Sequence, residues 1–241
     1  MKNTKFGLVG KNISYSFSQK YFTEKFSRLF LKDYRYDVFD LSDISKVQEL
    51  LRRNDLRGFN VTIPYKEQII PFLDELSEEA AKIGAVNTVL LKNGKATGYN
   101  TDAFGFEKTL LLHRKEHHKK ALILGDGGAA KAVKYVMDKN NIPFCTVSRK
   151  SDCNFENLTA QMVSEHQIIV QCTPVGTFPN TEDSVPFPFE ALTENHLVID
   201  LIYNPEYTAF IRNASQNGAK CTNGYFMLEQ QAEKAWEIWN F

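Results

Sequence analysis

The sequence has 241 residues, of which 43% are hydrophobic and 24% charged, a composition that supports a folded core and excludes a largely disordered chain. Its 29 basic and 29 acidic residues give a formal net charge of zero, so no overall field favours nucleic acid or an anionic membrane surface. At roughly 150 residues per domain, the length predicts one large or two modest domains, and we favour two.

Short apolar runs alternate with helical patterns along the first hundred residues, as in stacked βαβ units. The helical patterns cover residues 18–30, 44–53 and 66–83. Asn93 and Gly94 predict a tight hairpin turn, because both residue types tolerate the positive φ that such a turn needs. The predicted strands are 6–9, 34–39, 58–63, 88–91 and 95–99.

A second set of βα units begins near Lys119. Residues 121–124 form a continuous apolar run, typical of a strand buried on both faces of a parallel sheet. Further strands are predicted at 143–147, 167–170 and 197–201, and a helix at 104–112. The charged stretch 113–120 predicts a solvated connection rather than a metal or nucleic-acid site.

The last segment, 225–239, is an amphipathic helix whose apolar residues recur at helical spacing. We expect it to pack back on the first domain. The predicted fold class is therefore α/β with two domains. An N-terminal α/β domain comprises residues 1–102 and is completed by the C-terminal helix at 225–241, and a Rossmann-type domain comprises residues 103–224.

A glycine-rich turn follows the strand at 121–124 and opens a helix: Gly125-Asp126-Gly127-Gly128-Ala129. In this context glycines let the backbone approach a pyrophosphate, whose charge is met by N–H groups at the helix N-terminus. The pattern predicts a dinucleotide site, and a merely structural βα turn is the alternative. We expect Asp126 to face solvent, because an inward carboxylate would repel phosphate.

The end of the next strand carries Ser148, Arg149 and Lys150. An NAD site would place Asp or Glu about 20 residues after the glycine loop, to bind the ribose hydroxyls. No acid stands here, and Arg149 and Lys150 suit a 2′-phosphate by hydrogen bonding and by charge. The sequence therefore favours NADP over NAD, with a solvated basic loop as the alternative.

Polar residues also mark the end of the strand at 58–63. Alternation places Asn60 and Thr62 on one side of this strand, and Lys66 follows it closely. The carboxyl ends of strands line the crevice where α/β sheets bind ligands. These residues therefore indicate a ligand site, and a bystander surface lysine is the alternative for Lys66.

Asn87 and Asp102 stand at the two ends of the predicted hairpin and can reach the same rim. Asp102 alternatively caps the helix that begins near Phe104. Capping by Thr101 or Asn100 would leave the Asp102 carboxylate available for chemistry.

The chain resembles the shikimate dehydrogenase family from end to end, because seven motifs occur in that family's order. They are the serine segment after the first strand, 60–66 (Asn-Val-Thr-Ile-Pro-Tyr-Lys), 84–88 (Gly-Ala-Val-Asn-Thr), 98–102 (Gly-Tyr-Asn-Thr-Asp), the Gly125 loop, 173–176 (Thr-Pro-Val-Gly) and 224–231. The resemblance implies an NADP-dependent enzyme that interconverts 3-dehydroshikimate and shikimate in aromatic amino-acid synthesis.

The resemblance also implies roles for individual residues. Lys66 and Asp102 would form the catalytic pair, and Ser16 and Ser18 would bind the substrate carboxylate. The residues that contact or support the substrate ring would be Asn60, Thr62, Asn87, Tyr203 and Gln231. The cofactor-binding residues would be Gly125, Gly127, Gly128, Ala129, Ser148, Arg149, Lys150, Thr173 and Gly224, with Arg149 on the 2′-phosphate and Gly224 beside the nicotinamide.

The chain departs from the family pattern in three places. Near the serines, the usual Pro, His and Pro are Asn12, Tyr15 and Gln19. The usual Asn-Arg-Thr of the adenosine loop is residues 148–150, Ser-Arg-Lys, which keeps the arginine. Gln171 and Thr177 replace an Asn and a Met near Thr173.

Alternative functions are a broader quinate/shikimate dehydrogenase, a methylenetetrahydrofolate dehydrogenase of related plan, and a non-catalytic ligand sensor on the same fold. The paired serines disfavour the folate enzyme, and intact Lys66 and Asp102 disfavour the sensor.

Four scattered cysteines and five histidines form no ligand pattern, so we predict reduced thiols and no metal. No signal-like core or run of ~20 apolar residues occurs, so we expect a cytoplasmic protein with no membrane or nucleic-acid partner, present as a monomer or homodimer.

Overall fold

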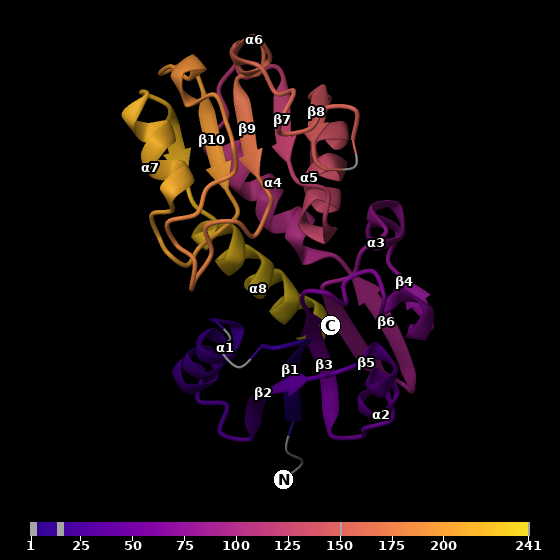
Figure 1. Cartoon of the computed structure of the whole chain (residues 1–241). Helices are drawn as coiled ribbons and strands as arrows, with labels where there is room; N and C mark the ends of the chain where they lie inside the picture. Colours follow the sequence, from indigo (N-terminus) through magenta and orange to yellow (C-terminus); the bar gives the residue numbers. More distant parts are fainter. Residues whose placement is uncertain (1–3, 14–16, 150, 241) are drawn as a thin grey trace. The chain divides into compact units, whose positions relative to one another are not determined.

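The computed structural model describes residues 4–13, 17–149 and 151–240, and the chain divides into two compact units (Figure 1). Unit 1 comprises residues 1–101 and 232–241, and unit 2 comprises residues 102–231. Each unit is built around one β-sheet with helices packed on it, which confirms the predicted two-domain α/β fold.

Unit 1 contains a mixed six-stranded sheet in the order β2-β1-β3-β5-β6-β4. β1 pairs in parallel with β2 and β3, whereas β3, β5 and β6 pair in antiparallel fashion. The strands are β1 (Thr4–Gly10), β2 (Tyr34–Asp40), β3 (Leu56–Val61), β4 (Glu75–Leu76), β5 (Thr88–Lys92) and β6 (Lys95–Tyr99). The helices are α1 (Phe17–Arg28), η1 (Ile44–Lys46), α2 (Val47–Leu51), η2 (Ile70–Phe72) and α3 (Glu78–Ile83).

The segment 66–83 is not the single helix that the sequence predicts. It forms turns, the short 3₁₀ helix η2, the two-residue strand β4 and only then α3. Pro71 lies in η2 and lacks the backbone donor that a continuous helix requires. Ser77 starts α3, because its side chain accepts a hydrogen bond from the Ala80 N–H at 3.1 Å, and Gly84 ends it with a φ of 69°.

Trp239, near the end of α8 (Tyr225–Asn240), anchors this helix on the sheet of unit 1. Its ring is fully buried and packs 4.9 Å from the Phe6 ring, while Nε1 donates to the Val89 carbonyl at 3.0 Å. Gly58 makes room for it, since a Cβ there would lie 2.4 Å from Nε1. The C-terminal turns of α8 therefore complete the N-terminal domain, as predicted.

An ion pair between a buried lysine and a partly exposed glutamate joins α1 to the same helix. Lys25, only 7% exposed, donates to both carboxylate oxygens of Glu233 and lies 5.7 Å from the centre of the Trp236 ring. Although burial opposes the shift, hydrogen bonds from Lys25 and Tyr21 lower the pKa of Glu233. Removing Glu233 would leave the buried Lys25 charge uncompensated, so this pair fixes α1 against α8.

Unit 2 contains an entirely parallel five-stranded sheet in the order β11-β10-β9-β7-β8. Its strands are β7 (Ala121–Leu124), β8 (Phe144–Val147), β9 (Ile168–Gln171), β10 (Leu197–Asp200) and β11 (Lys220–Thr222). Its helices are α4 (Thr101–His113), α5 (Gly128–Lys139), α6 (Ala160–Ser164), η3 (Phe189–Ala191), α7 (Ala209–Gln216) and the first part of α8. β7, β9 and β10 are buried at every position, as expected for strands covered on both faces, whereas the edge strand β8 is fully buried only at Val147.

The sequence predicts that the charged stretch 113–120 is a solvated connection. In the structure it is only partly solvated, because it contains a buried histidine. His118 is 1% exposed, and its Nδ1 accepts a hydrogen bond from the Lys115 N–H at 2.9 Å. Burial, assisted by the neighbouring His117, lowers the pKa of His118 to about 4. This side chain therefore closes the connection between α4 and β7 as a neutral acceptor.

None of the described helices combines the length and the apolar character needed to cross a membrane.

Candidate functional site

The predicted cofactor loops of unit 2 meet at the carboxyl ends of three neighbouring strands. β7 lies between β8 and β9, which follow it on opposite sides, so strand order reverses at β7. The Gly125 N–H donates to Val147 O, and the Cys172 N–H donates to Leu124 O, both at 2.8 Å. Ligands of α/β sheets bind at such a switch point.

Gly125 and Gly127, both in the loop after β7, have different surroundings. Gly125 has a φ of 112°, and a Cβ there would lie 3.1 Å from Thr173, so this position favours glycine. Gly127 begins α5 without a side-chain cap, and a Cβ there would meet no atom within 4 Å. The backbone immediately before α5 therefore has open space beside Gly127, which fits the approach of a pyrophosphate to the start of the helix.

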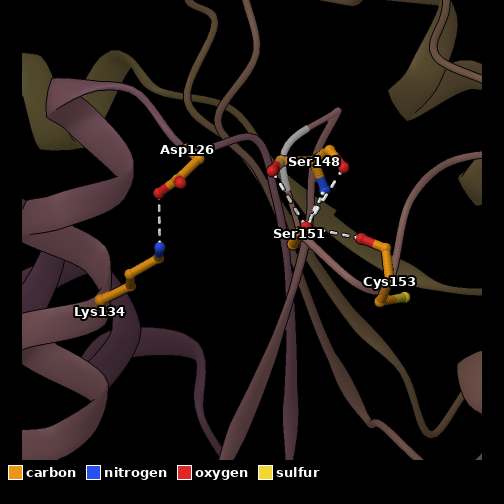
Figure 2. Close-up of polar contacts among 5 residues, drawn as sticks. All are labelled: Asp126, Lys134, Ser148, Ser151 and Cys153. Carbon is orange, nitrogen blue, oxygen red and sulfur yellow. Dashed lines mark hydrogen bonds and ion pairs between the residues drawn. The ribbon is translucent and has the colours of Figure 1, made fainter.

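Ser151 organises the loop after β8 (Figure 2). The Ser148 N–H donates to Ser151 Oγ at 2.9 Å, and Ser151 Oγ donates to Cys153 O at 2.6 Å. Arg149 is exposed between these fixed points, and Lys150 lies outside the described residues. Sequence reasoning did not identify Ser151, although a serine closing a short polar loop is a recognisable turn signal.

Gly224 lies against the backbone after β10. Its N–H donates to Ile202 O at 2.9 Å, and a Cβ would lie 2.1 Å from Leu201 O, so no other residue fits without moving the chain. Tyr203 follows and is 37% exposed. Gln231 lies in α8 at the end of unit 2, half-buried.

Asp200 holds the segment that carries Tyr203. It is fully buried at the end of β10, where its carboxylate accepts hydrogen bonds from the Ile202 N–H at 3.0 Å and the Thr208 hydroxyl at 2.6 Å. Burial raises the pKa of Asp200 to about 6, although these two hydrogen bonds oppose the shift. The folded protein therefore holds the Asp200 proton more tightly than the unfolded chain does.

This raised pKa predicts a pH-dependent stability. The contribution of Asp200 is fully present below its unfolded pKa and is lost as pH rises through about 6. Between about pH 7.5 and about pH 5, the free energy of unfolding of the wild type should rise by about 1.4 kcal/mol relative to Asp200→Asn. Urea unfolding of both proteins across this range measures the difference, and parallel curves would contradict it.

In unit 1, Tyr36 links two of the candidate substrate residues, Ser18 and Asn60. Through Asn60 it is also connected to Thr88, the neighbour of Asn87. Its hydroxyl donates to Asn60 Oδ1 at 2.7 Å and is hydrogen-bonded to Ser18. Asn60 Nδ2 donates in turn to Thr88 Oγ1 at 3.0 Å. Burial raises the pKa of Tyr36, so the phenol stays protonated and its donor is always available. The sequence alone did not identify Tyr36, because its neighbours come from α1 and β3.

The other candidates of unit 1 lie on the segments after β3 and before β5. The Thr62 N–H donates to Val9 O at 2.8 Å, and the Val86 N–H donates to Lys66 O at 2.7 Å, which places Lys66 next to the segment before β5 that carries Asn87. Ser16 lies outside the described residues.

Asn87 fixes the backbone immediately before Asp102. Its Oδ1 accepts from the Thr101 N–H at 2.7 Å, and its Nδ2 donates to Thr101 Oγ1 at 3.0 Å. Asn87 therefore supports the start of α4. Asp102 is 2% exposed in the first turn of that helix and belongs to unit 2, whereas Lys66 belongs to unit 1.

Within the part of the chain that the structure describes, no three His, Cys, Asp or Glu side chains come together as a metal ion would require.

A glycine loop at the switch point of a parallel sheet, joined to a second α/β unit, defines a two-domain protein with a Rossmann-type nucleotide-binding domain. Residues 8–89 match the family model described as the shikimate dehydrogenase substrate binding domain, and the shikimate dehydrogenase (NADP(+)) of Methanococcus maripaludis is 36% identical over 97% of this chain and 90% of its own length. The chain belongs to the shikimate dehydrogenase family.

Solved structures agree with this assignment. Shikimate dehydrogenase 1 of Peptoclostridium difficile is 36% identical, with a TM-score of 0.83 over 98% of this chain and 91% of its own. Shikimate 5-dehydrogenase of Thermus thermophilus, solved in complex with NADP(H) and shikimate, is 30% identical, with a TM-score of 0.86 over 98% and 93%.

Proposed function

We propose that this chain is an NADP-dependent oxidoreductase that reversibly reduces 3-dehydroshikimate to shikimate, a step towards chorismate and the aromatic amino acids. The observation that carries the proposal is 36% identity over 97% of the chain to a relative named shikimate dehydrogenase (NADP(+)). The loop after β8 supports the choice of cofactor, because the residue that follows Ser148 is the exposed Arg149 and not an Asp or Glu, and a guanidinium suits a 2′-phosphate.

The cofactor side is assigned to residues 103–224. NADPH, when bound, supplies the hydride. Gly125, Gly127, Gly128 and Ala129 hold the pyrophosphate, and the loop of Ser148, Arg149 and Lys150 holds the 2′-phosphate. Thr173 and Gly224 border the nicotinamide, where the close packing of Gly224 on Leu201 leaves the backbone itself as the contact surface.

The substrate side is assigned to residues 1–102 with 225–241. Ser16 and Ser18 donate to the substrate carboxylate and so select which ring face receives the hydride. The ring hydroxyls are contacted or supported by Asn60, Thr62, Asn87, Tyr203 and Gln231.

Lys66 and Asp102 form the catalytic pair in this proposal. As a ketone is reduced, negative charge develops on its oxygen, and Lys66 donates the proton that neutralises it. Asp102 orients the ammonium and hydrogen-bonds the reacting hydroxyl. In the reverse direction, Lys66 accepts the proton from shikimate.

The test is an absorbance assay for reduced cofactor, run with shikimate or quinate and with NADP or NAD. We expect turnover with shikimate and NADP, and much weaker turnover in the other three combinations. Equal rates with quinate would indicate the broader dehydrogenase. Binding of shikimate without turnover in any combination would indicate a sensor and contradict the proposal.

The hydroxyl of Tyr36 should matter for substrate binding. Tyr36→Phe removes the link between Ser18 and Asn60 and is expected to raise KM for shikimate about tenfold, the loss of about one buried hydrogen bond, with KM for NADP unchanged. Steady-state kinetics with each substrate varied in turn measures both constants.

Tyr34→Phe is the matched control, because Tyr34 lies on the same strand with its ring 5.7 Å from Phe6 in the same aromatic cluster. It should leave both KM values within about twofold. If Tyr36→Phe lowered only the thermal stability and left KM for shikimate unchanged, Tyr36 would have a purely structural role.

A cytoplasmic location and a monomeric or homodimeric state stay predictions.

A further inference from the structure

The glycine loop contains a carboxylate, Asp126, at a position where a pyrophosphate would approach. Asp126 forms an ion pair with Lys134 on α5, whose Nζ lies 2.6 Å from Asp126 Oδ1. Figure 2 shows the carboxylate turned toward the helix and away from Ser148 and Ser151. The Asp126 side chain is 40% exposed, in agreement with the solvent-facing position that the sequence suggests, and the Lys134 side chain is 26% exposed.

The charge of Lys134 also acts beyond its pair with Asp126. It acts on the thiol of Cys172, which directly follows β9: burial and Asp200 raise the pKa of this thiol, and the Lys134 charge opposes them. Because Asp126 closely follows the end of β7, the paired ammonium lies near the carboxyl end of that strand. A cation there influences both the loop after β7 and the segment that leads to Thr173.

Elementary electrostatics gives this ion pair a consequence for binding. Two like charges a few ångströms apart near a protein surface repel each other, and a pyrophosphate carries more than one negative charge. An unpaired Asp126 would therefore weaken the site that Gly127 and the start of α5 provide. When Lys134 neutralises this carboxylate, Asp126 has little effect on the binding of the pyrophosphate.

We propose that Lys134 is a positioning residue for NADP, which turns the Asp126 carboxylate away from the pyrophosphate site and cancels its charge. The inference rests on the proposed function, since it concerns the cofactor of that reaction. Lys134 acts through Asp126 and need not touch the cofactor. A lysine two turns into α5 is thus the compensation for an acidic residue in the glycine loop.

The experiment is a double-mutant cycle with Lys134→Met, Asp126→Asn and the combined variant. The dissociation constant of NADP is measured by calorimetry, and kcat and both KM values by the absorbance assay. Lys134→Met should weaken NADP binding about tenfold, leaving kcat and KM for shikimate within about twofold. Asp126→Asn should bind NADP as tightly as the wild type or up to about threefold more tightly, and the combined variant should return to within about threefold.

Ionic strength provides an independent readout. The loss caused by Lys134→Met should shrink when the ionic strength rises from about 0.05 M to about 0.5 M, because salt screens exposed charges. The matched control is Lys139→Met, which removes a lysine of the same helix that is paired with Glu107 at 2.7 Å, away from the glycine loop. It should change NADP binding by less than about twofold.

Three results would overturn the inference. If Lys134→Met bound NADP normally, the pair would have no role in binding. If the combined variant bound as weakly as Lys134→Met, Lys134 would contact the cofactor itself. If Lys139→Met weakened binding equally, the effect would be one of overall charge. In each case the wild type still oxidises shikimate with NADP, whereas a wild type that bound no NADP would refute the proposed function as well.

Discussion

Replacing Lys66 with alanine is expected to lower kcat about a thousandfold, while KM for NADP stays within about twofold. Lys66 follows β3 in a segment made of turns, half-buried, with its backbone held by the Val86 N–H. The backbone stays anchored in the variant, so only the proton donor is lost. Steady-state rates in both directions, with saturating shikimate or 3-dehydroshikimate, measure the effect.

Lys82→Ala serves as the control for this variant. Lys82 also belongs to unit 1, but it lies exposed on α3 and pairs with Glu78 at 2.6 Å. Its replacement should leave kcat within about twofold. A Lys66→Ala protein that unfolds at the wild-type temperature and retains kcat within about tenfold would show that another group transfers the proton.

The regular elements followed from local patterns, because each pattern coincides with a real burial preference. The run at 121–124 is buried at every position, and Asn93 and Gly94 adopt the positive φ values that the hairpin turn requires. The single helix predicted at 66–83 was wrong for an equally local reason. The helical spacing of apolar residues continues through Pro71, which has no backbone N–H to donate within a helix. Hydrophobic periodicity indicates which face of an element is buried, but it does not show that a residue lacks a backbone N–H.

Residues that act through a partner were the ones that sequence reasoning missed. Tyr36 reads as an ordinary strand residue, and its importance depends on Asn60, 24 positions away on β3. Lys134 reads as one of several lysines on α5, and only the fold places its ammonium on Asp126. Motifs thus supplied the candidate groups of the site, whereas the groups that orient them depend on tertiary contacts.

Replacing Arg149 with alanine is expected to raise KM for NADP about fiftyfold, and to leave the much weaker use of NAD nearly unchanged. The reason is that only NADP carries the 2′-phosphate, and a charged hydrogen bond to it is lost. Arg149 is exposed on a loop that Ser151 holds closed through Ser148 and Cys153, so its replacement leaves the loop itself intact. The assay compares kcat/KM for the two cofactors in wild type and variant.

Arg212→Ala tests whether the rise in KM for NADP depends on Arg149 itself or on the overall charge of unit 2. Arg212 lies on α7 in unit 2 and pairs with the exposed Glu182, so the same change removes one positive charge elsewhere. It should leave the ratio of kcat/KM for NADP over NAD within about twofold. An equal fall in that ratio for both variants would mean that NADP is selected by the general field of the domain. A fall confined to Arg149→Ala places the selection on one guanidinium, because only a group held by a closed loop can meet the phosphate at fixed geometry.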